Sequence, residues 1–208
     1  MLAKLVLAGV ASALIALVCE RIGTFLLDAL VSPRLKLYNV LLYFGIVALS
    51  EEGAKYLLLK RVSWRSGEFN CQYDAVVYAT FVSLGFALWE NISYVLRFGF
   101  GTALLRAVTA IPGHTCFGVF MGLFYGFARA YAYLGNEALS RRYRRLAVLV
   151  PVLIHGTYDY IISLQSPNIN TDLCFVVFIA VLFLVSFRLV RKISGNDRYM
   201  SRQNGWFR

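Results

Sequence analysis

The sequence predicts an all-α membrane protein, a polytopic bundle of about six transmembrane helices with one or two short interfacial helices. Of its 208 residues, 59% are hydrophobic and only 15% are charged, whereas soluble domains are typically about 45–50% apolar and about 25% charged. The hydrophobic residues also come in blocks, and a helix of about 20 apolar residues crosses a bilayer. We therefore expect one transmembrane helical domain over 1–190 and a basic cytoplasmic tail over 191–208.

Six apolar stretches have the length and composition of spanning helices. They are 2–19, 37–59, 73–96, 114–134, 146–164 and 173–190. The first lacks a small-residue cleavage site, which favours an uncleaved helix over a signal peptide. Residues 20–36 are half apolar and contain Pro33, which predicts an interfacial amphipathic helix. The apolar part of 97–113 is too short to span, which predicts an interfacial or re-entrant segment.

Basic residues in the connecting loops set the predicted orientation. The segments 60–72 and 135–145 and the tail from Arg188 onward are basic, whereas 165–172 carries no positive charge. Because positive loops stay in the cytoplasm, a multi-pass protein of the cell membrane with both termini inside is expected. These loops account for the net charge of +10, so we expect membrane lipid and no nucleic acid as a partner.

One predicted span contains three ionisable residues, Glu51, Glu52 and Lys55, within an otherwise apolar run. A charge at the bilayer centre costs at least about 2.5–3.5 kcal/mol, so such residues are functional candidates. Lys55 lies three and four residues after the two glutamates and shares a helix face with both. A structural ion pair needs only one carboxylate, and the second favours a general acid or base.

Three other stretches place polar side chains within apolar helices. They are Phe86-x-x-x-Glu90-Asn91, His114 near the start of a span, and His155-x-x-x-Asp159. Each also has a structural interpretation, namely an interhelical hydrogen bond, a helix cap and a satisfied buried pair, respectively. Gly118, Gly122 and Gly126 recur every four residues after His114 and indicate close helix packing.

This inventory suits peptide hydrolysis by an activated water. A glutamate takes a proton from water, and a histidine or asparagine stabilises the oxyanion. Glutamate and histidine also bind zinc, but the chain has no H-E-x-x-H motif, so a metal-free site is favoured. No serine–histidine pairing and no plausible cysteine nucleophile stands out.

In this order on successive spans, the four motifs resemble the PrsW family of intramembrane proteases, relatives of the CAAX prenyl endopeptidases and bacteriocin-processing enzymes. The resemblance covers about 40–160. The CAAX relatives typically show Glu-Glu-x-x-x-Arg and Phe-x-x-x-His, whereas this chain has Lys55 and Glu90, which favours the PrsW branch. The resemblance implies a glutamate-dependent, metal-independent peptidase without a cofactor. Its substrate would be a single-pass membrane protein, an anti-sigma factor cut at its extracytoplasmic side to start a stress response.

The resemblance also assigns roles by position. The implied catalytic residues are Glu51, Glu52, Glu90, His155 and Asp159, and the supporting residues are Lys55, Phe86, Asn91 and His114. Glu51 or Glu52 would activate water with help from Glu90. His155 and Asp159, with His114, would bind the substrate carbonyl or stabilise the oxyanion. The sequence leaves open which of the two glutamates is the base, and also the oligomeric state.

Two other functions are compatible with the same residues. A proton- or ion-coupled transporter would use the buried carboxylates as a relay, although no clear inverted repeat is visible. A non-catalytic scaffold would use the pocket to bind a transmembrane helix. The depths of the carboxylates also conflict, because Glu51 lies about 14 residues, roughly 21 Å, from the outer end of its predicted span. Glu90 lies nearer to the outer end of its own predicted span. Glu51 and Glu90 can therefore meet only if the helices tilt or the span boundaries shift.

Overall fold

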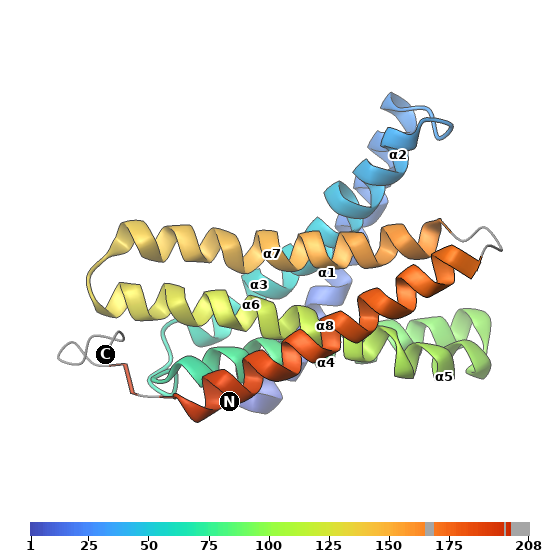
Figure 1. Cartoon of the computed structure of the whole chain (residues 1–208). Helices are drawn as coiled ribbons and strands as arrows, with labels where there is room; N and C mark the ends of the chain where they lie inside the picture. Colours follow the sequence, from blue (N-terminus) through green and yellow to red (C-terminus); the bar gives the residue numbers. More distant parts are fainter. Residues whose placement is uncertain (165–168, 198, 201–208) are drawn as a thin grey trace.

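The protein is a bundle of helices in the computed structural model, which describes residues 1–164, 169–197 and 199–200 (Figure 1). The elements are α1 (Leu2–Leu30), α2 (Lys36–Val40), η1 (Leu41–Ala48), α3 (Leu49–Ser63), α4 (Gln72–Phe98), α5 (Phe100–Val108), α6 (Ala110–Tyr133), α7 (Glu137–Ser163) and α8 (Ile169–Gly195). The described residues contain no strand beyond an isolated bridge between Cys71 and Tyr199. The predicted all-α class is confirmed.

Five helical stretches are long and apolar enough to cross a membrane, namely α1, α4, the run from α5 into α6, α7 and α8. The stretch predicted at 37–59 instead forms α2, η1 and α3 in direct succession, with η1 a π-helix. α3 is only 15 residues long and carries Glu51, Glu52 and Lys55. Leucines, valines and phenylalanines of α1 and α8 are exposed, as expected for helices that face lipid.

Three predicted boundaries change in the structure. α1 continues to Leu30, so a separate interfacial helix over 20–36 is wrong; the sequence has no proline before Pro33 to stop the first helix. α7 already begins at Glu137, because the Asn136 side chain accepts a hydrogen bond from the Leu139 backbone N–H. The predicted loop 135–145 is therefore largely helical, and α8 extends to Gly195 into the predicted tail.

The connection between α4 and α6 contains the expected short apolar helix. Gly99 ends α4 with a φ of 84°, a left-handed conformation that favours glycine. α5 follows and exposes Phe100, Leu104 and Leu105. Residues 165–168, 198 and 201–208, which hold part of the predicted outer loop and half of the predicted tail, lie outside the described residues.

α4 packs closely against both α1 and α6 through glycines. A Cβ atom built on Gly9 of α1 would overlap the Val82 carbonyl oxygen of α4, and one on Gly122 of α6 would overlap the Val76 Cα. The glycine series 118, 122 and 126 faces the first half of α4, between Gln72 and Ser83. These short approaches bring the polar residues of three helices within reach of one another.

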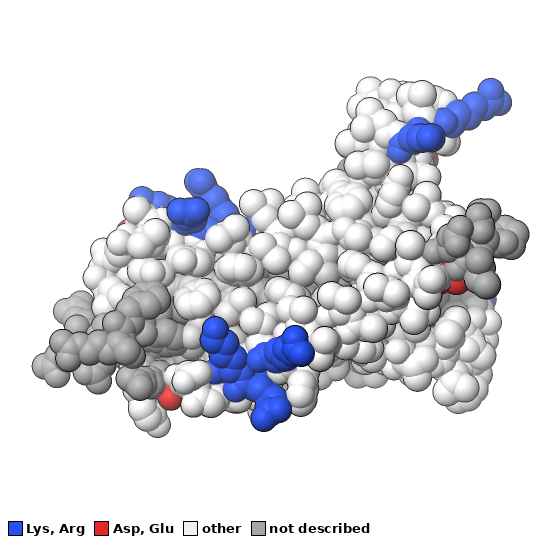
Figure 2. All heavy atoms as spheres, in the orientation of Figure 1, with Lys and Arg blue, Asp and Glu red and all other residues white. Residues whose placement is uncertain are grey.

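Basic side chains gather at one end of the bundle, over the first turns of α7 and the last turns of α8 (Figure 2). A smaller basic group lies over the connection between α1 and α2, and the surface between the two ends is largely uncharged. The described basic residues at the larger end include Arg61, Arg141, Arg142, Arg188 and Arg191, all exposed. This is the end that the positive-inside rule predicts to be cytoplasmic.

We predict that Gly122→Ala destabilises the bundle, because the new methyl group overlaps the α4 backbone. The expected loss is about 1–3 kcal/mol in the free energy of unfolding, measured by thermal unfolding in detergent. Gly45→Ala is the matched control, since no atom lies within 4 Å of its added Cβ. Equal stability of the two variants would contradict this packing.

Candidate active site

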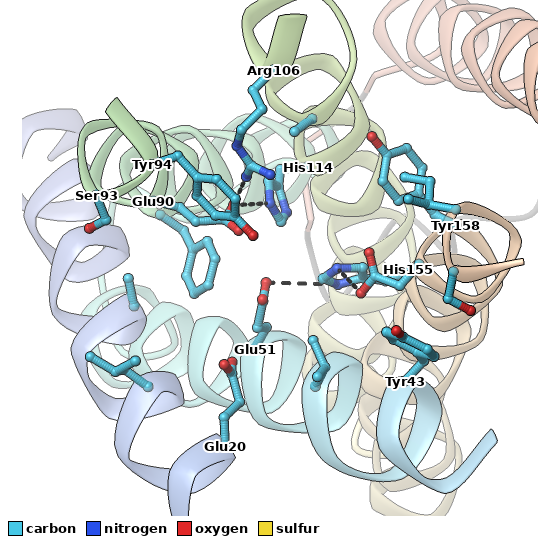
Figure 3. Close-up of a pocket in the computed structure, with 18 of the residues that line it drawn as sticks. Glu20, Tyr43, Glu51, Glu90, Ser93, Tyr94, Arg106, His114, His155 and Tyr158 are labelled. Atoms are coloured by element: carbon cyan, nitrogen blue, oxygen red, sulfur yellow. Dashed lines mark hydrogen bonds and ion pairs between the residues drawn. The ribbon is translucent and has the colours of Figure 1, made fainter. Parts of the chain in front are cut away.

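A cavity of about 1010 Å³ opens among α1, η1, α3, α4, α5, α6 and α7. Its lining comes from one half of the bundle: the second half of α1, the ends of α4 and α7, and the start of α6. The ionisable residues that line it are Glu20, Arg21, Asp28, Glu51, Glu90, Arg97, Arg106, His114, His155 and Asp159. Figure 3 shows Glu20, Glu51, Glu90, His114 and His155 around this space, each from a different helix. The polar motifs of the sequence therefore converge on one site.

The two adjacent glutamates of α3 differ in their surroundings. Lys55 Nζ lies 2.7 Å from Glu52 Oε1 and 3.4 Å from Glu51 Oε2. Glu52 and Lys55 are completely buried, whereas Glu51 is 6% exposed and lines the cavity. Glu52 does not belong to the cavity lining. One carboxylate thus faces the cavity and the other lies behind it.

His155 of α7 lies between carboxylates. Its Nδ1 is 2.9 Å from Glu52 Oε1 and 3.9 Å from Glu51 Oε2, and its Nε2 is 3.3 Å from Asp159 Oδ2. The ring also stacks on Phe117, with centroids 4.7 Å apart. Contacts on both nitrogens and one face fix the orientation of this imidazole.

Glu90 of α4 belongs to a second chain of contacts. Glu90 Oε2 lies 2.8 Å from His114 Nε2 and 2.7 Å from Arg106 Nη2. The other nitrogen of His114, Nδ1, lies 3.1 Å from Lys55 Nζ. Lys55 therefore connects the α3–α7 contacts with those of α4, α5 and α6.

The remaining predicted residues lie as follows. The Phe86 ring centroid is 3.8 Å from Lys55 Nζ, which places the ammonium over the aromatic face. Asn91 is not among the cavity-lining residues, and its Oδ1 has no hydrogen-bond partner. Glu51 and Glu90 line the same cavity despite their different predicted depths, and α1 and α2–η1–α3 run obliquely across α4, α6 and α7 (Figure 1).

Sequence reasoning missed two residues of this site. Glu20 of α1 points into the cavity (Figure 3), but the first span was predicted to end one residue before it. Arg106 of α5 pairs with Glu90, and its guanidinium carbon lies 3.6 Å from the Tyr94 ring centroid. Arg106 falls in the stretch 97–113, for which the sequence predicts an interfacial or re-entrant segment. The available signal is a charge at the edge of an apolar run, after ALIALVC for Glu20 and within ALLRAV for Arg106.

The fold and this site define a membrane protein with a polar centre buried among its helices. A sequence model described as "PrsW family intramembrane metalloprotease" matches residues 1–187. The chain belongs to the PrsW family of intramembrane proteases. Protease PrsW of Oceanobacillus iheyensis is 33% identical over 74% of this chain and 67% of its own length. Protease PrsW of Clostridioides difficile is 30% identical over 77% of this chain and 68% of its own length. No solved structure matches this chain.

The family description names a metal, whereas the sequence alone predicted no metal and no cofactor. Glu51, Glu52, His114 and His155 each offer one donor atom, and these atoms all lie within 4.8 Å of one another. Such donors suit zinc, but tetrahedral zinc with bonds of about 2.0–2.2 Å draws its donors to within about 3.5 Å. Lys55 Nζ also contacts a nitrogen or oxygen atom of three of the four residues. As arranged here, the residues do not fit a metal ion.

We predict that Glu52→Ala destabilises the protein strongly, because it leaves the buried Lys55 ammonium without its closest partner and also frees His155. The expected loss is about 3–5 kcal/mol in the free energy of unfolding, measured by chemical or thermal unfolding in detergent. Glu137→Ala is the control, since its ion pair with Arg144 is largely exposed and is worth about 1 kcal/mol at most. Similar losses for the two variants would contradict a structural role for Glu52.

Proposed function

We propose that this protein is an intramembrane peptidase in which Glu51 activates the water that attacks the peptide bond. The observation that carries the proposal is the difference between the two glutamates. Glu51 lines the cavity, while Glu52 is withdrawn behind it and bound to Lys55 and His155. A base must reach the reacting water, so Glu51 is favoured for this role and Glu52 for holding its neighbours.

The proposed reaction needs one carboxylate that gives and takes a proton. Glu51 removes a proton from water as the water oxygen bonds to the peptide carbonyl carbon. The carbonyl π electrons move to its oxygen, which becomes an oxyanion. When the oxyanion collapses, the C–N bond breaks, and Glu51 returns the proton to the departing nitrogen. His155, held by Glu52 and Asp159, lies beside Glu51 and fixes the geometry of that side of the cavity.

Arg106 is the favoured donor to the oxyanion. Both nitrogens of His155 and both nitrogens of His114 already contact side chains of the site. Arg106 lines the cavity, and its buried Nε has no hydrogen-bond partner. A fixed, desolvated donor aimed at a developing negative charge stabilises the transition state. This role differs from the one the family resemblance implied for the histidines.

The position of the cavity supports cleavage on the outer side. With both termini in the cytoplasm and the continuous run α2–η1–α3 taken as the sixth crossing, the lining segments lie mainly in the outer halves of their helices. At the inner end, Leu59, Phe69 and Tyr125 are fully buried and close the bundle. The family resemblance implies a single-pass protein of the cell membrane as substrate, an anti-sigma factor, and the position of the cavity supports a cut at its extracytoplasmic side. The closed inner end also counts against the transporter alternative.

We predict that Glu51→Gln lowers peptide cleavage by a factor of about 10²–10⁴, the contribution of a general base. The measurement is mass spectrometry of new protein ends in membranes from cells that express the wild type or the variant. Glu137→Gln is the control, because Glu137 is exposed at the opposite end of α7. Unchanged cleavage in Glu51→Gln would refute the assignment. Capture of a membrane protein without any cleavage by the wild type would support the scaffold alternative.

We predict that Arg106→Ala lowers kcat by about 10²–10³, as expected when one oxyanion donor is removed. Arg106→Lys should recover only part of this loss, because lysine has no planar fork of donors. The assay is the rate of cleavage of a substrate found in the preceding experiment. Arg34→Ala, an exposed arginine between α1 and α2 that does not line the cavity, should leave kcat unchanged. A pure effect on KM in Arg106→Ala would contradict the role.

A further inference from the structure

We propose that the Lys55 ammonium is the resident cation of the four-donor cluster of Glu51, Glu52, His114 and His155. A divalent metal ion and Lys55 then exclude one another, and a metal binds the cluster only when the lysine side chain has left it. This inference concerns the same site as the proposed function. It does not require that the chain cleave any substrate, because its readout is metal binding.

The first observation is where the ammonium lies. Lys55 Nζ is 2.7 Å from Glu52 Oε1, 3.1 Å from His114 Nδ1 and 3.4 Å from Glu51 Oε2. These three atoms belong to three of the four residues that could hold a metal. The lysine is fully buried. The ammonium thus occupies the space that a shared metal ion would need.

The second observation is the balance of charge. Glu51 and Glu52 are adjacent carboxylates, and Lys55 is the only lysine or arginine among the described residues that forms an ion pair with either. Arg106 pairs with the more distant Glu90. A dication in the cluster would add two positive charges about 3 Å from the Lys55 ammonium. Because charges repel strongly at this distance in a buried site, one of the two cations has to leave.

The third observation is that the cluster has unused capacity for a cation. Glu52 Oε2 is buried and has no hydrogen-bond partner, although carboxylate oxygens in a protein interior are normally satisfied. The cavity beside Glu51, His114 and His155 also offers room for a displaced side chain. The cluster is therefore suited to a metal in its chemistry, and the lysine is the group that blocks it.

Zinc binding to the untagged, full-length protein in detergent tests this proposal. After removal of metals with a chelator, zinc affinity is measured by competition with a zinc-binding dye, and bound zinc is counted by elemental mass spectrometry. Lys55→Met removes the charge and keeps most of the volume. We expect it to bind one zinc at least about 100-fold more tightly than the wild type, since displacing a buried, paired ion is costly.

Two variants serve as controls for that comparison. Lys60→Met removes a lysine from the same helix outside the cluster and should bind zinc as the wild type does. Lys55→Met/His155→Ala removes the charge and one donor, and it should lose the gain in affinity. Equal affinity of the wild type and Lys55→Met would overturn the proposal. Absence of zinc binding by a folded Lys55→Met protein would overturn it as well.

A second measurement uses the wild type and does not depend on whether Lys55→Met folds. A small amine-reactive reagent is applied with and without millimolar zinc, and modified lysines are identified by peptide mass spectrometry. Lys55 should be unreactive without zinc and should become labelled when zinc displaces it, while labelling of Lys60 stays constant. Stoichiometric zinc binding with Lys55 still unlabelled would show that both cations share the cluster, which contradicts the proposal.

Discussion

Lys55 and Glu52 form an ion pair of 2.7 Å between two side chains that have no solvent exposure. Inside a membrane protein such a pair persists only when further partners compensate the loss of hydration. Those partners come from other helices: His155 from α7 contacts Glu52, and His114 from α6 contacts Lys55. The need to satisfy one buried pair thus fixes where three helices meet.

The close helix contacts make that meeting possible. Gly9 and Gly85 bring α1 and α4 together, and the glycine series of α6 lies against α4. With these backbones in contact, short side chains such as Glu90 reach across to the next helix. The tilt of α1 and α2–η1–α3 adds Glu20 and Glu51 to the same cavity. Small residues and buried charges therefore act together, as they do in membrane helix bundles generally.

Spacing along one helix could be predicted from the sequence, and spacing between helices could not. The i, i+4 relation predicted that Glu51 faces Lys55 and that His155 faces Asp159, and the distances are 3.4 Å and 3.3 Å. The all-α class followed from composition. Glu20 and Arg106 were missed because their place in the site depends on the crossing of α1 and the path of α5. Neighbouring residues on a helix point about 100° apart. Because Glu90 points into the cavity, Asn91 directly after it points elsewhere and does not line the cavity.

The asymmetry of the adjacent glutamates explains why the motif has two carboxylates and one lysine. A single glutamate that neutralised Lys55 would have its oxygens committed to the ion pair and would be poorly placed to accept a proton. With Glu52 as the close partner at 2.7 Å, Glu51 at 3.4 Å keeps its position at the cavity wall. The lysine then does two things at once, because it allows both carboxylates to exist in an apolar bundle and occupies the place between them. The chemistry open to Glu51 is consequently decided by a residue one helical turn away.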